Sequence, residues 1–343
     1  MRLVPAVLWL ALCAASPAFA QTAPVAPAPA SSVTNLESVV VSGVQPGPGL
    51  WKVSKGDHVM WVLGALSALP EHMQWKTDEV EQTIAASQEV LSAPSVNIKL
   101  KTNFFGKLFL LPTLIGARKN PDGVTLQQAL PASEYARWEV LKQKYIGSDR
   151  DVESWRPMFA AIELYEKAIK RSGLKASGGV KDTVRELAKK HNVKVTSTRY
   201  EMVIEEPRAA MKTFKKSPMD DQQCFSQALD TVEHDLGSVT ARANAWAVGD
   251  IEALRGLPLN DRRDACIEAV TGAGFAEKLG FKDLPQRVES TWMGEVDRAL
   301  SSNAQTFALL PMEEVLSPTG YLAKLKAKGY VVQAPDEQDA AAP

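Results

Sequence analysis

The spacing of hydrophobic residues predicts buried strands at several places along the chain. Val59–Leu63 is an unbroken apolar run followed by Gly64, a pattern typical of a strand that is buried on both faces. Val96–Leu100 alternates apolar and polar residues, as a half-buried strand does. Residues 193–203 are rich in β-branched residues, and Phe307–Leu310 is a second apolar run. We therefore expect a sheet whose strands come from both ends of the chain.

Helical spacing fills most of the sequence between these strands. A helix is predicted to begin at Asp78, with an apolar face that extends as far as Leu91. Residues 220–301 are predicted to be largely helical throughout. A last helix is predicted to begin at Ser317, with the serine as its cap, and to end at Gly329. The expected fold class is α/β, with a central mixed β-sheet flanked by helices and a largely α-helical middle segment.

The first 20 residues have the pattern of a bacterial-type signal peptide. Arg2 supplies a positive charge, and the apolar run Val4–Ala15 is too short to span a bilayer. Ala18-Phe19-Ala20 then offers the small residues that a signal peptidase needs, so cleavage is expected before Gln21. Cys13 leaves lipoprotein processing open as an alternative, although Leu12 stands where that processing prefers a small residue. The mature protein is expected in the periplasm or outside the cell.

Composition divides the remaining chain into a folded domain and two tails. Residues 21–48 are rich in Ala and Pro and are expected to form a disordered linker, and residues 333–343 a disordered tail. A single domain is expected over 49–332, with no transmembrane segment in the mature chain. The 343 residues carry 39 basic and 40 acidic side chains, a formal net charge of −1. This balance argues against nucleic acid as a partner and gives no sign of a membrane partner.

The sequence contains few catalytic or cofactor-binding motifs. It has no Walker loop, no G-x-G-x-x-G, no C-x-x-C and no H-E-x-x-H, so no cofactor is expected. The mature chain has two cysteines, Cys224 and Cys266. In an oxidising compartment they would form a disulfide, and otherwise they would be two buried thiols. The sequence leaves these two alternatives open.

Four segments, in order, resemble the TraB/GumN family. The opening Gly49–His58 precedes the first buried strand, and Asp221–Gln223 resembles the acidic-Gln segment of the family. Trp246 with Gly249-Asp250 and Leu254 resembles its W-x-x-G-D-x-x-x-L segment, and 320–332 its closing helix and strand. The resemblance implies an α/β domain related to the erythromycin-esterase-like and Tiki proteins. Tiki proteins are metal-dependent proteases, so the resemblance also implies a metal-dependent active site in the family.

The residues that would carry this chemistry are replaced. The first G-x-x-H tetrad of the family falls on Gly64 to Ser67, so serine stands in place of histidine. A family Glu aligns with Ala93, and the second tetrad loses its glycine and ends in Glu314 in place of histidine. The Arg-Asn pair of the family keeps at most Arg287. Because a catalytic metal needs about three protein ligands, the sequence predicts a pseudoenzyme with no metal and no catalytic residue.

Three functions remain open at this stage. The first is a non-catalytic protein of the cell envelope that binds an unknown protein or peptide ligand. The second is a metal-dependent hydrolase or peptidase of the same fold with altered ligands, for which Glu71, His72 and Glu314 are the weak candidates. The third is an envelope-assembly module that shares only the fold. The position of His72 relative to Ser67, Ala93 and Glu314 would separate the first from the second.

Overall fold

A computed structural model describes residues 47–339, except 176–178 and 258–261. The expected signal peptide and residues 21–46 of the expected linker lie outside the described residues. The described residues group into one compact unit, which contains the hydrophobic clusters found among them. Pro48, the last residue of the expected linker, is already buried in this unit.

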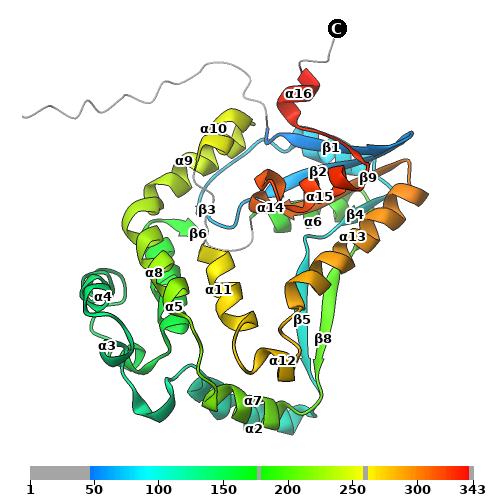
Figure 1. The fold of residues 1–343 in the computed structure, drawn as a ribbon. Coiled ribbons are helices and arrows are strands. Elements are labelled where there is room, and N and C mark those ends of the chain that lie inside the picture. The colour runs from blue at the N-terminus through cyan, green and yellow to red at the C-terminus, as the bar shows by residue number, and fades with distance from the viewer. Residues whose placement is uncertain (1–46, 176–178, 258–261, 340–343) are drawn as a thin grey trace, which may run out of the picture. The chain divides into compact units, whose positions relative to one another are not determined.

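A six-stranded mixed sheet forms the larger half of the unit (Figure 1). Its fold class is therefore α/β, as the sequence predicts. The strand order is β10, β1, β2, β9, β4, β7, and the strands are β1 (Leu50–Lys55), β2 (His58–Ala65), β4 (Glu89–Leu91), β7 (Lys194–Thr196), β9 (Gln305–Pro311) and β10 (Val331–Gln333). Strand β2 pairs antiparallel with β1 and parallel with β9, and β9 pairs parallel with β4.

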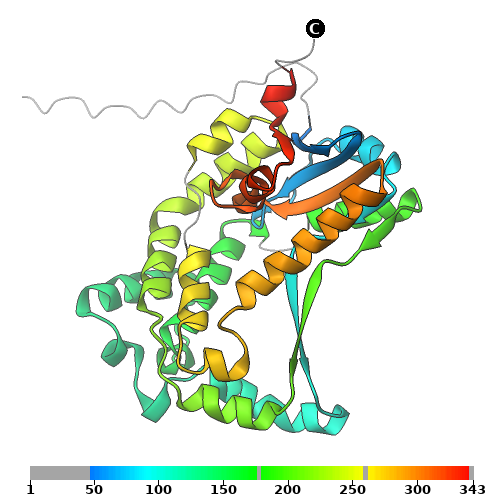
Figure 2. The same ribbon diagram turned by 45° about the vertical axis from the view of Figure 1, so that its right-hand side comes forward.

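Two groups of helices cover the two faces of this sheet. Figures 1 and 2 show α1 (Asp78–Ala85) and α6 (Val180–Lys190) behind it, and α13 (Leu284–Ser302) and α15 (Tyr321–Ala327) in front. The short helix α14 (Met312–Leu316) follows β9 directly. Burial on both faces explains why Val62 and Leu63 of β2 are fully buried and why β2 is apolar throughout its second half.

The middle of the chain builds a second, helical core. It contains α3 (Leu126–Ala129), α4 (Ala132–Tyr145), α5 (Pro157–Arg171), α8 (Gln222–Asp230) and a π-helical turn (Thr231–Asp235). Trp138 and Phe225 are fully buried there, with ring centroids 5.5 Å apart. The helices α9 (Leu236–Ala247) and α10 (Ile251–Gly256) contribute buried residues to the core of the main sheet instead. Two smaller clusters include residues of α11 (Arg262–Thr271) and α12 (Ala276–Leu279). Between residues 222 and 302 the described chain is helical apart from short breaks, as a largely α-helical segment of an α/β fold should be.

A parallel two-stranded ribbon, β5 (Ser95–Leu100) with β8 (Arg199–Ile204), extends away from the main sheet (Figure 2). At its far end lie α2 (Phe104–Ala117) and α7 (Pro207–Lys216), which contact each other. A second short pair joins β3 (Leu69–Pro70) to β6 (Leu174–Lys175). The remaining short helices are two 3₁₀ turns (Pro121–Gly123 and Asp151–Ser154) and α16 (Pro335–Asp339). No helix of the described residues is both long and apolar enough to cross a membrane.

Three expectations about element boundaries are wrong. The helix that begins at Asp78 ends at Ala85, and of the predicted apolar face only Val80 and Ile84 belong to it. Leu91 belongs to strand β4, because it pairs with Ala308 of β9. The last helix begins at Tyr321 with Gly320 as its cap, since Ser317 instead forms a turn in which its hydroxyl accepts a hydrogen bond from the Thr319 amide.

The third wrong expectation concerns the tail after residue 332. Val331–Gln333 forms β10, and α16 follows it. Ala334 is buried, and the Gln338 amide donates a hydrogen bond of 3.0 Å to the Leu50 carbonyl. Backbone pairing with β1 therefore orders a segment whose composition alone predicts disorder.

A buried carboxylate joins the amino-terminal ends of the parallel strands. Glu89, the first residue of β4, is only 4% exposed. It accepts hydrogen bonds from Arg298 of α13 at 2.7 and 2.9 Å, from Asn303 at 2.5 Å and from Thr196 of β7 at 2.6 Å. Burial by itself raises the pKa of Glu89, but these hydrogen bonds outweigh it and the net pKa lies below the ordinary value.

Glu89→Gln is expected to lower the free energy of unfolding by about 2 kcal/mol at pH 7, because it removes charge-assisted hydrogen bonds from a buried site. A carboxyl group whose pKa is lowered by folding stabilises the fold above its unfolded pKa, and this contribution is lost as the pH falls through the folded value. The difference between the two proteins should therefore shrink as the pH falls below about 4. Urea unfolding at several pH values measures it.

Glu295→Gln is the matched control, because Glu295 pairs with the same Arg298 in an exposed i,i+3 geometry. It should change the free energy of unfolding by less than about 0.5 kcal/mol. Equal losses for the two variants, or a Glu89→Gln loss that does not depend on pH, would show that the network does not stabilise the fold in this way.

Candidate functional site

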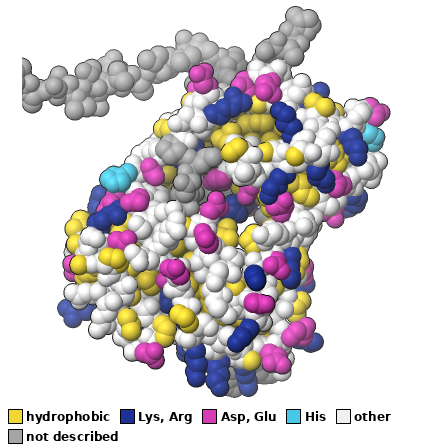
Figure 3. Space-filling model, viewed as in Figure 1, with side chains coloured by type: hydrophobic (Ala, Val, Ile, Leu, Met, Phe, Trp, Pro, Cys, Tyr) yellow, Lys and Arg dark blue, Asp and Glu magenta, His cyan; other side chains and the backbone are white. Residues whose placement is uncertain are grey.

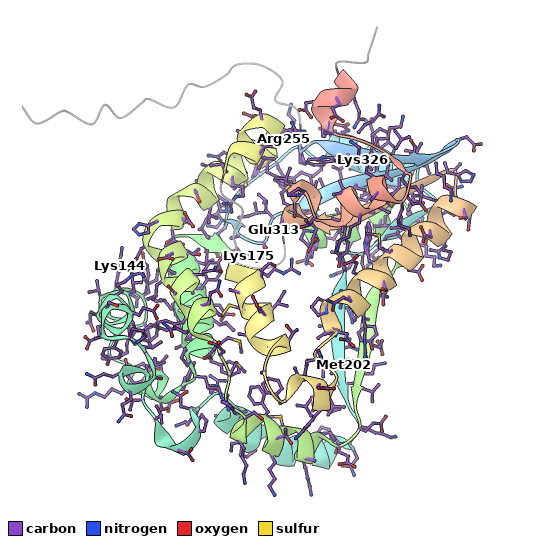
Figure 4. The ribbon with its side chains drawn as sticks, viewed as in Figure 1. Lys144, Lys175, Met202, Arg255, Glu313 and Lys326 are labelled. Atoms are coloured by element: carbon purple, nitrogen blue, oxygen red, sulfur yellow. A yellow bond between two sulfur atoms is a disulfide. The ribbon has the colours of Figure 1, made fainter. Side chains whose placement is uncertain are left out.

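A cleft of about 900 Å³ lies where the carboxyl ends of the parallel strands meet the helical core. Residues from the loops after β2 and β4 line one side of it, together with α14 after β9. Helices α5, α9, α11 and α13 contribute the other sides. In the view of Figure 3, acidic side chains gather in the middle of this face, and Figure 4 labels Glu313 there on α14. Open sheets with parallel strands place ligand sites at this edge.

The structure brings together the positions at which the sequence showed replaced residues. Ser67, two residues after β2, is exposed and lines the cleft. Glu314 lines it from α14. Ala93 is 8% exposed, and its neighbour Pro94 is part of the cleft wall. The loop after β2, the loop after β4 and helix α14 therefore converge on one cavity, which Ser67, Pro94 and Glu314 line.

Two of the three candidate metal ligands, Glu71 and His72, lie away from the cleft. Glu71 and His72 are exposed and lie outside the residues that line the cleft. Among the residues that the structure describes, no three His, Cys, Asp or Glu side chains are grouped closely enough to hold a metal ion. Glu71, His72 and Glu314 therefore do not form a ligand set here.

Charged side chains concentrate at Glu314. Burial raises the pKa of Glu314, and the nearby acids Asp264 and Glu313 raise it further, while Arg263 and Lys324 act in the opposite direction. The Arg263 guanidinium lies 3.9 Å from the Glu314 carboxylate, at the limit of an ion pair. Lys324 is already engaged by Glu289 at 2.6 Å. Glu314 is thus a partly buried carboxyl group with incomplete charge compensation.

Close packing fixes the position of Glu314. A Cβ atom at Gly320 would lie 2.4 Å from the Glu314 carbonyl oxygen, so only glycine allows the turn after α14 to fold back onto it. Tyr321 follows directly, and its ring lies 5.4 Å from the ring of Trp292. Burial, and next the charge of Glu314, raises the pKa of the Tyr321 phenol, so the hydroxyl stays protonated.

A comparison with protein families shows which family the chain belongs to. The model of the TraB/PrgY/gumN family matches residues 49–334, which is most of the sequence. The chain belongs to the TraB/PrgY/gumN family. No curated protein and no solved structure matches it.

The family-like W-x-x-G-D segment supports one wall of the cleft. The Trp246 indole donates a hydrogen bond of 2.6 Å to the carbonyl of Gly64, close to the end of β2. Gly249 has a φ of 68°, and a Cβ atom there would lie 2.9 Å from the Gly47 carbonyl oxygen. The Asp250 carboxylate caps α10 by accepting from the Ala253 amide at 2.9 Å. Trp246 thus attaches α9 to the sheet, while Gly249 and Asp250 shape the turn into α10.

Asp221, from the acidic-Gln segment, has a similar structural role. It is 4% exposed, and its carboxylate accepts a hydrogen bond of 2.8 Å from the Met158 amide at the start of α5. Met158 itself lines the cleft. The net effect of burial is to raise the pKa of Asp221 despite this bond.

Cys224 and Cys266 form a disulfide, one of the two alternatives that the sequence left open. Their Cα atoms are 4.6 Å apart, and the bond joins α8 to α11. Cys224 is fully buried, whereas Cys266 lines the cleft. Helix α11, which carries Arg263, is thus covalently attached to the helical core.

Sequence reasoning missed the residues on the helical side of the cleft. Arg263 and Glu289 lie outside the four family-like segments. Tyr321 and Lys324 lie within the segment that resembles the closing helix, but nothing in its sequence marks them as residues of a site. Only the three-dimensional arrangement of α11, α13 and α15 brings them to Glu314.

Replacing both Cys224 and Cys266 with serine is expected to lower the free energy of unfolding by about 2–4 kcal/mol, because the bond closes a loop of 42 residues. Amide hydrogen exchange in α11 should accelerate more than exchange in α13, since only α11 loses its attachment. Urea unfolding and exchange mass spectrometry measure the two effects.

The wild-type protein treated with a reductant is the matched control and should behave as the double variant does. An unchanged free energy of unfolding together with unchanged exchange in α11 would show that the disulfide does not hold this wall of the cleft.

Proposed function

We propose that this TraB/PrgY/gumN protein is an exported, non-catalytic protein of the cell envelope that binds an organic ligand in the cleft. The observation that carries the proposal is the set of residues at the strand ends. Ser67 and Glu314 line the cleft, and Ala93 precedes the lining residue Pro94. The family resemblance implies His, Glu and His at positions 67, 93 and 314. Only Glu314 retains a side chain that binds divalent transition metals well.

The donor set argues against a metal-dependent reaction at this site. A catalytic zinc site uses about three protein ligands and one open position. Ser67 offers a neutral hydroxyl and Ala93 offers nothing. No histidine of the described chain lines the cleft, so no imidazole is at hand to complete the set.

The shape and polarity of the cleft fit an organic ligand. Its volume lies in the range of small-molecule and peptide side-chain sites. Its walls include the apolar side chains of Leu66, Met158 and Ile162. Five acidic side chains line it against three basic ones, and the acidic residues are Asp264, Glu268, Glu289, Glu313 and Glu314. This excess favours a ligand that combines an apolar group with an amine or amide donor, as a peptide segment does.

Export is supported by the N-terminal sequence and by the disulfide. Ala18-Phe19-Ala20 provides the cleavage site expected of a signal peptide. Disulfides such as Cys224–Cys266 persist in oxidising compartments, of which the periplasm is one. The two features come from separate parts of the chain and favour the same location.

One observation favours a second candidate, a hydrolase that uses Glu314 without the family's metal ligands. A carboxyl group in a cleft with a raised pKa is a candidate general acid. In that case Glu314→Gln would abolish a hydrolytic activity, whereas in a binding protein it would change only the affinity for a ligand.

Restoring the family pattern tests the main proposal. The triple variant Ser67→His, Ala93→Glu and Glu314→His is expected to bind about one Zn²⁺ per chain, at least about tenfold more tightly than the wild-type protein does. The reason is that the loops after β2 and β4 and helix α14 already converge at the cleft, so that only the donor atoms are missing. Isothermal titration calorimetry with Zn²⁺ measures the stoichiometry and the affinity.

A control variant with the same exchanges at exposed positions on three separate helices is Ser133→His, Ala327→Glu and Glu252→His. It should bind Zn²⁺ no better than the wild-type protein. If the wild-type protein itself binds one Zn²⁺ per chain and Glu314→Ala removes that binding, the non-catalytic proposal is wrong.

A further inference from the structure

Helix α2 presents an apolar stripe to solvent at the far end of the β5–β8 ribbon. Phe104 is 75% exposed, Leu108 53% and Ile115 58%. Pro112 is also exposed, and the spacing of these four residues places them on one face of the helix. The 14 residues of α2 contain one charged residue, Lys107. An exposed apolar helix face of this kind marks an interaction surface.

The neighbouring helix α7 presents a basic stripe. Arg208, Lys212, Lys215 and Lys216 are all exposed, and their spacing places them on one side of α7. None of the four forms an ion pair with a residue that the structure describes. Lysines elsewhere at this end are paired, as Lys101 with Glu205 and Lys119 with Asp151 show. Figure 3 shows basic side chains gathered along the lower edge, where Figure 1 has α7 and α2.

The two stripes border each other, and α7 is held firmly. The Lys215 ammonium group would lie 3.2 Å from a Cβ atom built at Gly116, the neighbour of Ile115. The buried Arg156 guanidinium donates hydrogen bonds to the carbonyls of Phe214, Lys215 and Ser217, the last turn of α7 and its cap. The basic stripe is therefore a fixed feature of the fold.

We propose that α2 and α7 form a docking surface for a bilayer that contains anionic phospholipid, with α2 lying in the plane of the interface. A helix of 14 residues is about 21 Å long, which is too short to cross a hydrocarbon core of about 30 Å. An apolar helix face next to uncompensated basic side chains is the combination by which peripheral proteins bind anionic lipid surfaces. The net charge of the whole chain is close to zero because acidic residues elsewhere balance these basic ones, so it does not indicate the local positive charge of α7.

A second copy of the chain is the other occupant to consider. A two-fold symmetric contact through α2 would bring the same patch of both copies together. The basic stripes of two α7 helices would then face each other with no acidic partner on α7, whose sequence contains no Asp or Glu. The charge pattern therefore favours an anionic lipid surface over self-association.

Flotation with vesicles tests the proposal, using residues 21–343, which keep the compact unit whole. Binding is expected to vesicles of phosphatidylglycerol and phosphatidylcholine mixed, to be weak with phosphatidylcholine alone, and to fall as salt is raised. Lys212→Gln with Lys216→Gln should weaken binding about tenfold or more. Leu108→Gln with Ile115→Gln should weaken it to a similar extent, because the inserted apolar area is lost.

Two control variants match these changes elsewhere on the surface. Lys181→Gln with Lys326→Gln removes the same charge from exposed positions, and Val140→Gln replaces a valine that is 69% exposed on α4. Both controls should bind within about twofold of the unchanged protein. Equal binding by all variants, or no binding to anionic vesicles, would overturn the proposal. A dimer in sedimentation equilibrium that Leu108→Gln dissolves, without vesicle binding, would assign the surface to a second copy instead.

Discussion

Parallel pairing of β9 with β2 on one side and β4 on the other is the constraint on which the rest of the structure depends. The register places Ala65 beside Pro311 and Leu91 beside Ala308, so the three strands end at the same edge of the sheet. The segments that follow them must meet there, although more than 200 residues separate the end of β4 at Leu91 from the start of β9 at Gln305. Those residues fold into the ribbon and the helical core, whose α11 and α13 complete the cleft.

The two ends of these parallel strands carry different kinds of carboxyl group. At the amino ends Glu89 accepts hydrogen bonds from Arg298, Asn303 and Thr196, which lower its pKa. These bonds give Glu89 a structural role. At the carboxyl ends burial raises the pKa of Glu314, since Arg263 lies 3.9 Å away and Lys324 is paired with Glu289. A carboxyl group that the protein leaves undercompensated is available to a ligand, which is why the cleft and not the Glu89 network is the functional candidate.

Much of the sheet could be predicted from the sequence because buried parallel strands are continuously apolar, as Val59–Leu63 and Phe307–Leu310 are. The convergence of Ser67, Ala93 and Glu314 was predictable only through the family resemblance. Arg263 and Tyr321 could not be predicted, since no local pattern reports which helix faces which loop. The ordering of 333–339 was missed because the backbone of β1, and not the composition of the tail, stabilises it. The apolar stripe of α2 lies within the sequence, but its exposure is a tertiary property.

Native mass spectrometry of the protein isolated from its host, with elemental analysis of the same sample, tests the central claim most directly. The account predicts a chain that starts at Gln21, holds less than about one tenth of a transition-metal ion per molecule, and carries either no adduct or an organic adduct. An organic adduct should be weakened by Glu314→Ala. One metal ion per chain, retained in the wild-type protein and lost in Glu314→Ala, would contradict the account and would establish a metal site in the cleft.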